Sequence, residues 1–215
     1  MQSSSVESAG RLVSSKINYD VNTVARTLEE ALTENGIPLV ELVEESPVLL
    51  VFLRHAGCTF CREALSDISI SRDRIEGDGV KIVLVHLGDR AEMKKVVARY
   101  GLSDLERICD PEHKLYGAFG LKRGTWARVY GPKVWLRGLI AGMFRGHGFD
   151  WPAADYTQMP GVFYIDKGLV LKSYRHKTAA DRPCYEDLCA DPAQTFNLKE
   201  SGKIKHSGTK HKGNS

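Results

Sequence analysis

The most constraining feature of this sequence is the stretch from Leu49 to Glu63, which reads LLVFLRHAGCTFCRE. It begins with a continuous apolar run, which is typical of a strand buried on both faces. A short loop follows, and after Cys58 the apolar residues, beginning with Cys61 and Leu65, recur at helical spacing. The stretch therefore predicts a strand, a tight loop and a helix that opens with C-x-x-C.

The position of the two cysteines on the predicted helix suggests redox chemistry. Cys58 lies at the helix N-terminus, where free N–H groups and the helix dipole favour an anion. We therefore expect the pKa of Cys58 to fall below the usual value of about 8.5. Cys61 lies one turn further on, is expected to be more buried, and is close enough to attack a mixed disulfide formed at Cys58.

Two other uses of such a pair remain open. Zinc would need two further ligands, but Cys184 and Cys189 are five apart, and His206 and His211 lie in a tail whose composition is typical of disorder. Inert core thiols are the second alternative, since free cysteine is frequently buried. The strand, loop and helix favour redox chemistry over both. We expect neither a metal nor a cofactor, because the sequence shows no set of four metal ligands and no G-x-G-x-x-G after a strand.

Charge and composition exclude several classes of partner. The net charge is +3 over 215 residues. The segment 200–215 alone supplies this charge, with four lysines against one glutamate. We therefore expect neither a nucleic acid nor an acidic membrane as a partner. No apolar run approaches the roughly 20 residues of a membrane span. The polar start, MQSSSVESAG, does not resemble a secretory signal, which predicts a reducing, cytoplasmic setting.

The order of the remaining patterns predicts an α/β, thioredoxin-like fold with a central mixed sheet flanked by helices. A second apolar strand is expected at 80–87, and Asp166-Lys167-Gly168 should join two further strands as a hairpin. Pro160 precedes this hairpin. In thioredoxin-like folds a cis proline that faces the cysteine pair occupies this place, and we expect Pro160 to be cis. The alternative is an ordinary proline at the start of a strand.

We expect three parts along the chain. Residues 1–46 form an N-terminal helical extension, 47–190 the thioredoxin-like domain, and 191–215 a disordered basic tail. Within the domain, 123–156 contains all three tryptophans with interleaved arginines. This aromatic segment is expected to be an inserted helix that either packs on the sheet or forms a partner or substrate surface. The other three cysteines receive no role from the sequence; they are Cys109, Cys184 and Cys189.

Three motifs carry a resemblance to a known family. FLRHAGCTFCREAL, ICDPEHKLYGAFGL and QMPGVFYIDKGLVLKSYRHKTAADRP are similar to peroxiredoxin-like proteins of the alkyl hydroperoxide reductase/thiol-specific antioxidant (AhpC/TSA) superfamily, in particular the group related to selenoprotein L. The resemblance covers roughly Pro47 to Ala190. It implies a thioredoxin fold, thiol-based redox activity on disulfides or hydroperoxides, and an external reductant such as thioredoxin or glutathione. It is also compatible with a homodimer.

The chain departs from true peroxiredoxins at their active-site motif, P-x-x-x-T-x-x-C. With Cys61 in the cysteine place, Cys58 replaces the threonine and Arg54 the proline. Peroxiredoxins usually also carry an arginine just before the strand that is expected here at Val162–Ile165. This arginine is missing, and the sequence there reads Gln158-Met159-Pro160. Arg54, or an arginine further along the chain (Arg123 or Arg128), is a candidate to replace it.

We therefore expect a thiol-disulfide oxidoreductase in which Cys58 attacks and Cys61 resolves. The first alternative is a thiol-dependent peroxidase, with Cys61 or Cys58 as the peroxide-reactive thiol. The second, of another class, is a non-catalytic redox-sensing or binding module. Arg54 and His55 are candidate site residues. His55 could stabilise a thiolate or transfer a proton, or it could be a solvated loop histidine.

Overall fold

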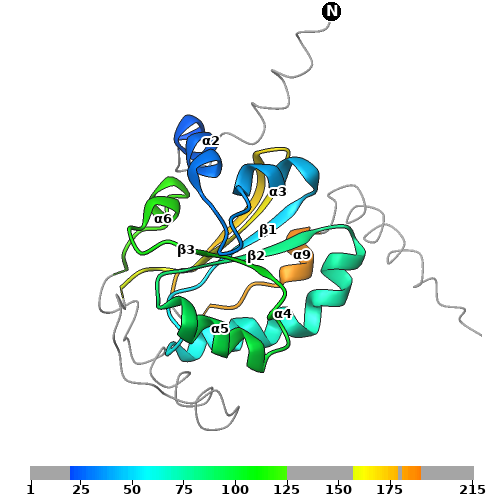
Figure 1. The fold of residues 1–215 in the computed structure, drawn as a ribbon, viewed down its shortest axis with the longest axis vertical. Coiled ribbons are helices and arrows are strands. Elements are labelled where there is room, and N and C mark those ends of the chain that lie inside the picture. Colours follow the sequence, from blue (N-terminus) through cyan, green and yellow to red (C-terminus); the bar gives the residue numbers. More distant parts are fainter. Residues whose placement is uncertain (1–19, 125–156, 179–180, 190–215) are drawn as a thin grey trace, which may run out of the picture.

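The computed structural model describes residues 20–124, 157–178 and 181–189, which form a mixed sheet flanked by helices (Figure 1). The elements follow one another in this order: α2 (Val21–Glu30), α3 (Leu39–Glu45), β1 (Val48–Phe52), α4 (Thr59–Gly77), β2 (Lys81–His86), α5 (Arg90–Arg99), β3 (Glu106–Cys109), α6 (Lys114–Ala118), β4 (Gly161–Asp166), β5 (Leu169–Arg175) and α9 (Tyr185–Cys189).

The five strands lie in the order β3-β2-β1-β4-β5, so β1 is the central strand. β1, β2 and β3 run parallel to one another, while β4 is antiparallel to β1 and to β5. The helices α4 and α5 make the two parallel crossovers, which need connections of this length. The predicted α/β fold with a mixed sheet is confirmed, including the hairpin at 166–168.

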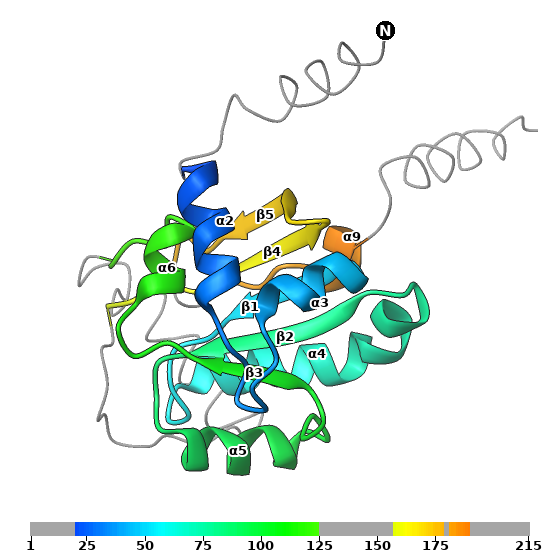
Figure 2. The same cartoon turned by 45° about the horizontal axis from the view of Figure 1, so that its top comes forward.

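The side chains of β1 alternate between two cores, as the period of a strand requires. Leu49 and Val51 pack in the core beneath α4, α5 and α9. Leu50 and Phe52 pack in the opposite core beneath α2, α3 and α6. Figure 2 shows the two helical layers on either side of the sheet. Because both faces are covered, β1 is buried along its whole length and reads as a continuous apolar run.

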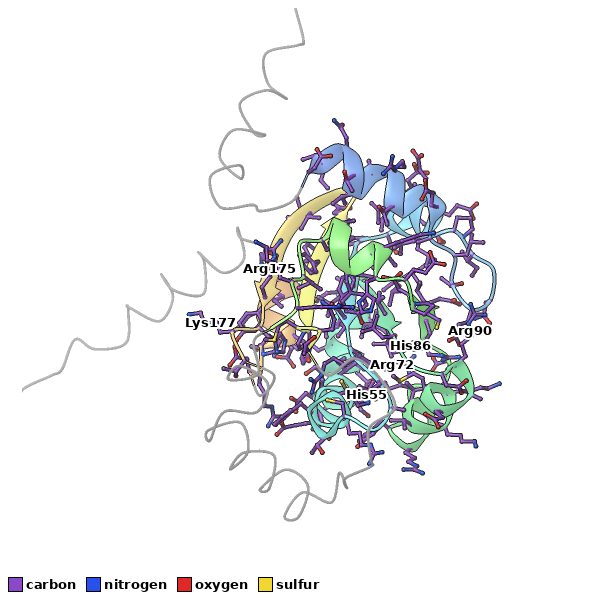
Figure 3. All side chains as sticks on the ribbon, turned by 90° about the vertical axis from the view of Figure 1, so that its left-hand side faces the viewer. His55, Arg72, His86, Arg90, Arg175 and Lys177 are labelled. Carbon is purple, nitrogen blue, oxygen red and sulfur yellow. The ribbon has the colours of Figure 1, made fainter. Side chains whose placement is uncertain are left out.

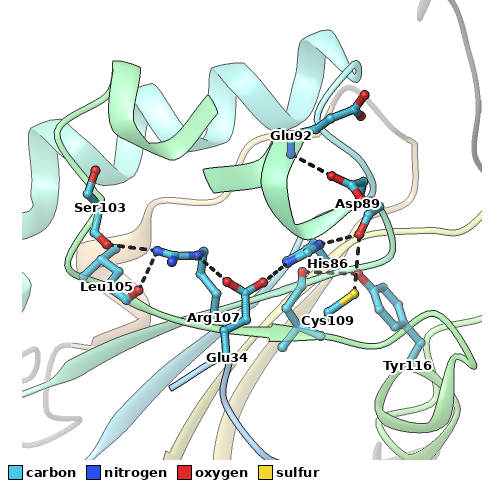
Figure 4. Close-up of polar contacts among 11 residues, drawn as sticks. Glu34, His86, Asp89, Glu92, Ser103, Leu105, Arg107, Cys109 and Tyr116 are labelled. Atoms are coloured by element: carbon cyan, nitrogen blue, oxygen red, sulfur yellow. Dashed lines mark hydrogen bonds and ion pairs between the residues drawn. The ribbon is translucent and has the colours of Figure 1, made fainter. Parts of the chain in front are cut away.

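The segment before Pro47 is tied to the sheet by polar contacts as well as by packing. The Glu34 carboxylate lies 3.0 Å from Nε2 of His86 on β2 and accepts a hydrogen bond from Nε of Arg107 on β3 at 3.1 Å (Figure 4). The backbone N–H of Glu34 also donates to the carbonyl of Arg107 at 2.7 Å. The three side chains are largely buried, so α2 and α3 are joined to the sheet rather than projecting from it.

The motif D-P-E-x-K-L-Y builds the entry to α6. The Asp110 carboxylate accepts backbone hydrogen bonds from Lys114, Leu115 and Tyr116 at 2.9, 2.8 and 3.2 Å, which satisfies N–H groups that a helix start leaves free. Tyr116 is fully buried, and its hydroxyl donates to the carbonyl of Leu53, the residue directly after β1. The motif therefore fixes α6 against the strand that precedes the cysteines.

Two predictions lie almost wholly outside the described residues. These are the inserted helix at 123–156, apart from Arg123 and Gly124, and the tail at 191–215. Arg123 forms an isolated antiparallel bridge with Gln158. None of the helices in the described part of the chain has the length and apolar character needed to cross a membrane.

Candidate active site

The two cysteines of the C-x-x-C motif lie where the sequence predicts them. β1 ends at Phe52, Cys58 is the N-cap of α4, and Cys61 lies in the first turn of that helix. Both are free thiols, and both are buried, with exposed fractions of 4% for Cys58 and 5% for Cys61. The expectation that Cys61 is the more buried of the two is therefore wrong, because the loop after β1 encloses both sulfurs.

Arg54 contacts both sulfur atoms. Its guanidinium Nη2 donates to Sγ of Cys58 at 2.9 Å, and its backbone N–H donates to Sγ of Cys61 at 3.2 Å. The Arg54 side chain is itself buried. A buried guanidinium needs a compensating anion, and the nearby thiolate can supply it. The structure thus brings together Arg54, Cys58 and Cys61, all three of which the sequence singles out.

The two thiols differ in their electrostatics. The hydrogen bond from Cys61 and the positive charge of Arg54 hold the pKa of Cys58 well below its usual range, against the effect of burial. Burial and the hydrogen bond to Cys58 raise the pKa of Cys61 well above its usual range. The Cys58 side chain accepts no capping hydrogen bond from α4. The lowered pKa thus follows the expected direction, but its main cause is the neighbouring thiol and guanidinium, not a helical N–H group.

His55 follows Arg54 in the same loop and is buried, with an exposed fraction of 6% (Figure 3). The idea of a solvated loop histidine is therefore wrong, because the loop folds inward over the start of α4. Burial lowers the pKa of His55, and the charge of Cys58 acts in the opposite direction. His55 and Cys58 therefore influence each other's protonation electrostatically.

Pro160 lies beside the cysteines but in a different conformation from the one predicted. It lines the same cavity as Cys58 and Cys61. The described residues contain no cis peptide bond, so the Met159–Pro160 bond is trans and the prediction of a cis proline is wrong. Pro160 immediately precedes β4, where a proline removes no ladder hydrogen bond, and its carbonyl accepts from the backbone N–H of His176 at 3.3 Å.

The cavity beside the cysteines has a volume of about 20 Å³. Its walls include polar side chains that the sequence did not identify: His176, Asp181, Arg182 and Tyr185. They follow β5 and lead into α9, far from the cysteines in sequence. Three of the four lie in or next to the motif YRHKTAADRP, and the motif was the only available signal for them.

The other cysteines lie apart from this cavity. Cys109 ends β3 and its thiol donates to the carbonyl of Gly88 at 3.4 Å. Cys184 is exposed, and Cys189 is buried in α9, where burial raises its pKa to about 12. Cys109 is thus a strand-end thiol. In the described ranges, no group of three or more His, Cys, Asp or Glu residues is arranged to hold a metal ion.

The fold and the site together define a class. A mixed sheet with a buried dithiol after its central strand is the arrangement of thioredoxin-like proteins. Residues 23–174 match the model of the AhpC/TSA family, which is more than half of the chain. The chain belongs to the AhpC/TSA family, as its motifs predicted.

Curated relatives share about a quarter of their residues with this chain. It is 25% identical to thioredoxin-like protein AAED1, chloroplastic, of Arabidopsis thaliana, over 73% of this chain and 66% of that protein. It is 26% identical to prostamide/prostaglandin F synthase of Danio rerio, over 83% and 90%. It is 28% identical to peroxiredoxin-like 2C of Bos taurus, over 64% and 64%. The chain thus spans slightly less than two thirds of the first and third relatives.

Solved peroxiredoxin structures share the fold. A cysteine variant of Xanthomonas campestris peroxiredoxin Q aligns with a TM-score of 0.52 and 14% identity, over 82% of this chain and 94% of that one. A PrxQ variant from Xylella fastidiosa aligns with a TM-score of 0.51 and 11% identity, over 82% and 92%. These likenesses support the thioredoxin-like fold of the described residues.

Proposed function

We propose that this protein is a thiol-disulfide oxidoreductase in which Cys58 attacks the substrate and Cys61 resolves the intermediate. The observation that carries the proposal is the unequal environment of the two sulfurs. Arg54 donates from its guanidinium to Cys58 but only from its backbone to Cys61. A thiolate is the nucleophile in thiol exchange, while the resolving thiol must stay protonated until the mixed disulfide has formed.

The proposed cycle transfers two electrons from the dithiol to the substrate. The Cys58 thiolate forms a bond to one substrate sulfur, the substrate S–S bond breaks, and its electron pair leaves on the other sulfur as a thiolate. Cys61 then gives its proton to solvent and attacks Sγ of Cys58, which releases the second thiolate and leaves a Cys58–Cys61 disulfide. An external thiol reductant of the thioredoxin or glutathione type restores the dithiol. No prosthetic group takes part.

A second candidate is a thiol-dependent peroxidase, which family membership favours. Here the Cys58 thiolate attacks the terminal oxygen of a hydroperoxide, the O–O bond breaks, and its electron pair leaves on the alkoxide, which water protonates; Cys58 becomes a sulfenic acid. Cys61 displaces water from it and forms the same disulfide.

Single-cysteine variants test the assignment. Cys58→Ser should abolish mixed-disulfide formation and turnover with every substrate. Cys61→Ser should react once and then stall, with the substrate trapped on Cys58. Mass spectrometry after one equivalent of disulfide, and separately of hydroperoxide, reads both outcomes. The matched control is Cys184→Ser, because Cys184 is exposed and lies outside the cavity. Rapid sulfenic acid formation at Cys61 in the Cys58→Ser variant would instead give the attacking role to Cys61.

A further inference from the structure

His176 reaches the active-site cavity from the end of the edge strand β5. It follows β5, and its backbone N–H donates to the carbonyl of Pro160 at 3.3 Å. Its ring packs edge-on against Tyr174, with 5.3 Å between ring centroids and 83° between ring planes. These contacts hold the imidazole against the cavity that Cys58 also lines. The side chain is thus positioned by backbone and ring contacts rather than by a polar partner.

The charged side chains around His176 are already engaged. Arg182 donates from Nη1 to Glu63 at 2.9 Å and from Nε to Asp67 at 2.8 Å. The Asp181 carboxylate accepts from the hydroxyl of Thr178 at 2.7 Å and from two backbone N–H groups. Both side chains are thereby held by residues of the protein, so neither is well placed to hydrogen-bond a substrate.

The imidazole of His176 differs from these neighbours. Its Nδ1 is buried and has no hydrogen-bond partner within the described residues. A buried polar atom without a partner costs free energy, so such an atom beside a cavity is a candidate to bind a ligand. The cavity volume of about 20 Å³ exceeds the roughly 10–15 Å³ that one water molecule requires. The space therefore suits one small polar atom.

We propose that His176 is a catalytic residue that donates a hydrogen bond from Nδ1 to the leaving atom of the substrate when Cys58 attacks. This inference rests on the proposed attack by Cys58. With a hydroperoxide, the new bond joins the sulfur to the terminal oxygen, and the electron pair of the broken O–O bond goes to the alkoxide oxygen. With a disulfide, the pair goes to the departing sulfur. In both cases His176 keeps its proton, and water protonates the product anion.

The charge state of His176 suits a donor that keeps its proton. Burial lowers the pKa of His176 to about 4, with Asp181 raising it and Arg54 lowering it. The ring is therefore neutral near about pH 7, and the tautomer with hydrogen on Nδ1 can donate. A neutral donor stabilises developing negative charge without ion pairing to the resting Cys58 thiolate. Removing one such donor typically costs on the order of 100-fold or more in rate.

Leaving-group basicity gives the proposal a specific signature. An alkoxide is a more basic leaving group than an alkyl thiolate, and an aromatic thiolate with nitro substituents is the least basic of the three. The more basic the leaving atom, the stronger the hydrogen bond that it accepts. His176→Leu should therefore slow the reaction of tert-butyl hydroperoxide by about 100-fold, a dialkyl disulfide less, and a nitro-aromatic disulfide hardly at all. The single-turnover rates of Cys58 are compared at a pH where Cys58 is fully ionised in each protein.

Two further variants test which ring nitrogen acts. Asparagine places its amide near the position of Nδ1, and glutamine places it near Nε2. His176→Asn should thus restore most of the lost rate with the hydroperoxide, and His176→Gln should not. Lys177→Leu is the matched control, since Lys177 is the next residue, is exposed and points outward (Figure 3). Equal slowing with all substrates, or better rescue by glutamine, would overturn the proposal.

The outcomes also separate this inference from the proposed function. If wild-type Cys58 reacts with none of the three substrates, the proposed function fails. If wild-type Cys58 reacts and His176→Leu is as fast as wild type with the most basic leaving group, only the role of His176 fails. If only the hydroperoxide fails to react, the test uses the two disulfides, which still differ in leaving-group basicity. His176→Leu should then slow the dialkyl disulfide more than the nitro-aromatic disulfide.

Discussion

Nη2 of Arg54 lies 2.9 Å from Sγ of Cys58, and the backbone nitrogen of the same residue lies 3.2 Å from Sγ of Cys61. One residue thus makes a charged contact with one thiol and an uncharged contact with the other. Because only the charged contact strongly favours an anion, Arg54 helps to decide which sulfur is the nucleophile. This relationship gives the first prediction.

Arg54→Met should raise the pKa of Cys58. The loss of a cation in contact with an anion typically shifts a pKa by roughly 1–3 units. Alkylation of Cys58 by a neutral reagent should then slow at any pH below the raised pKa, because less thiolate is present. Thiolate absorbance during a pH titration measures the pKa directly. Arg90→Met is the matched control, since Arg90 is an exposed arginine at the start of α5.

An unchanged pKa of Cys58 would contradict this role of Arg54. If Arg54→Met leaves the pKa of Cys58 unchanged, the hydrogen bond from Cys61 and the charge of His55 would account for the lowered value. Arg54→Lys helps to separate charge from shape. A lysine that restores a low pKa shows that the positive charge matters, whereas a pKa that stays high shows that the geometry of the guanidinium is needed.

The local part of the site could be predicted from the sequence because its signals are local. The apolar run of β1 and the helical spacing after Cys58 lie within one short stretch, so pattern alone places both cysteines at the start of α4. The same logic gave the mixed sheet and the hairpin. The conformation of Pro160 could not be predicted in this way, because its peptide bond depends on how β4 meets the cavity.

Site residues that are distant from the cysteines in sequence could not be predicted from local sequence patterns. Arg182 donates a hydrogen bond to Asp67, which lies 115 positions away in the sequence, and neither segment alone predicts this contact. His176 faces the cavity because the β4–β5 hairpin returns the chain to the start of β4, where its backbone bonds to Pro160. The Glu34 network likewise joins segments 52 and 73 positions apart, so the docking of α2 and α3 was missed.

Glu34→Ala should strongly destabilise the protein. It would leave the buried Arg107 guanidinium without its carboxylate partner, and breaking one side of a buried ion pair typically costs about 3–5 kcal/mol. The free energy of unfolding in urea measures the loss. Glu30→Ala is the matched control, because Glu30 pairs with Arg26 on the exposed face of α2 and such pairs contribute about 0–1 kcal/mol. Similar losses in the two variants would contradict a buried network.

Tyr116→Phe should lower the free energy of unfolding by roughly 1–3 kcal/mol, because it removes a buried hydroxyl that donates to the Leu53 carbonyl. The same hydroxyl lies 3.3 Å from the carbonyl of Val85. Leu53 precedes Arg54, so we also expect a small rise in the pKa of Cys58 as this end of β1 loosens. Urea unfolding and thiolate absorbance measure the two effects. An unchanged stability would show that water replaces the hydroxyl without cost.

Acid should destabilise the protein partly through His176. Burial lowers its pKa from 6.5 to about 4, so in this range the unfolded chain binds a proton that the folded protein does not. The neutral His176 ring therefore costs no stability above pH 6.5. As the pH falls from 6.5 to 4, the free energy of unfolding decreases progressively, and the loss reaches about 3 kcal/mol at pH 4.

His176→Asn removes this titration while keeping a polar side chain at the position. Its unfolding free energy, measured in urea from about pH 7 down to pH 4, should therefore fall less steeply than that of the wild type, with the two curves diverging by up to about 3 kcal/mol. His55 and His86, whose pKa values burial also lowers, are present in both proteins, so their contributions cancel in the difference. Parallel curves would show that the His176 imidazole gains a proton as readily in the folded protein as in the unfolded chain.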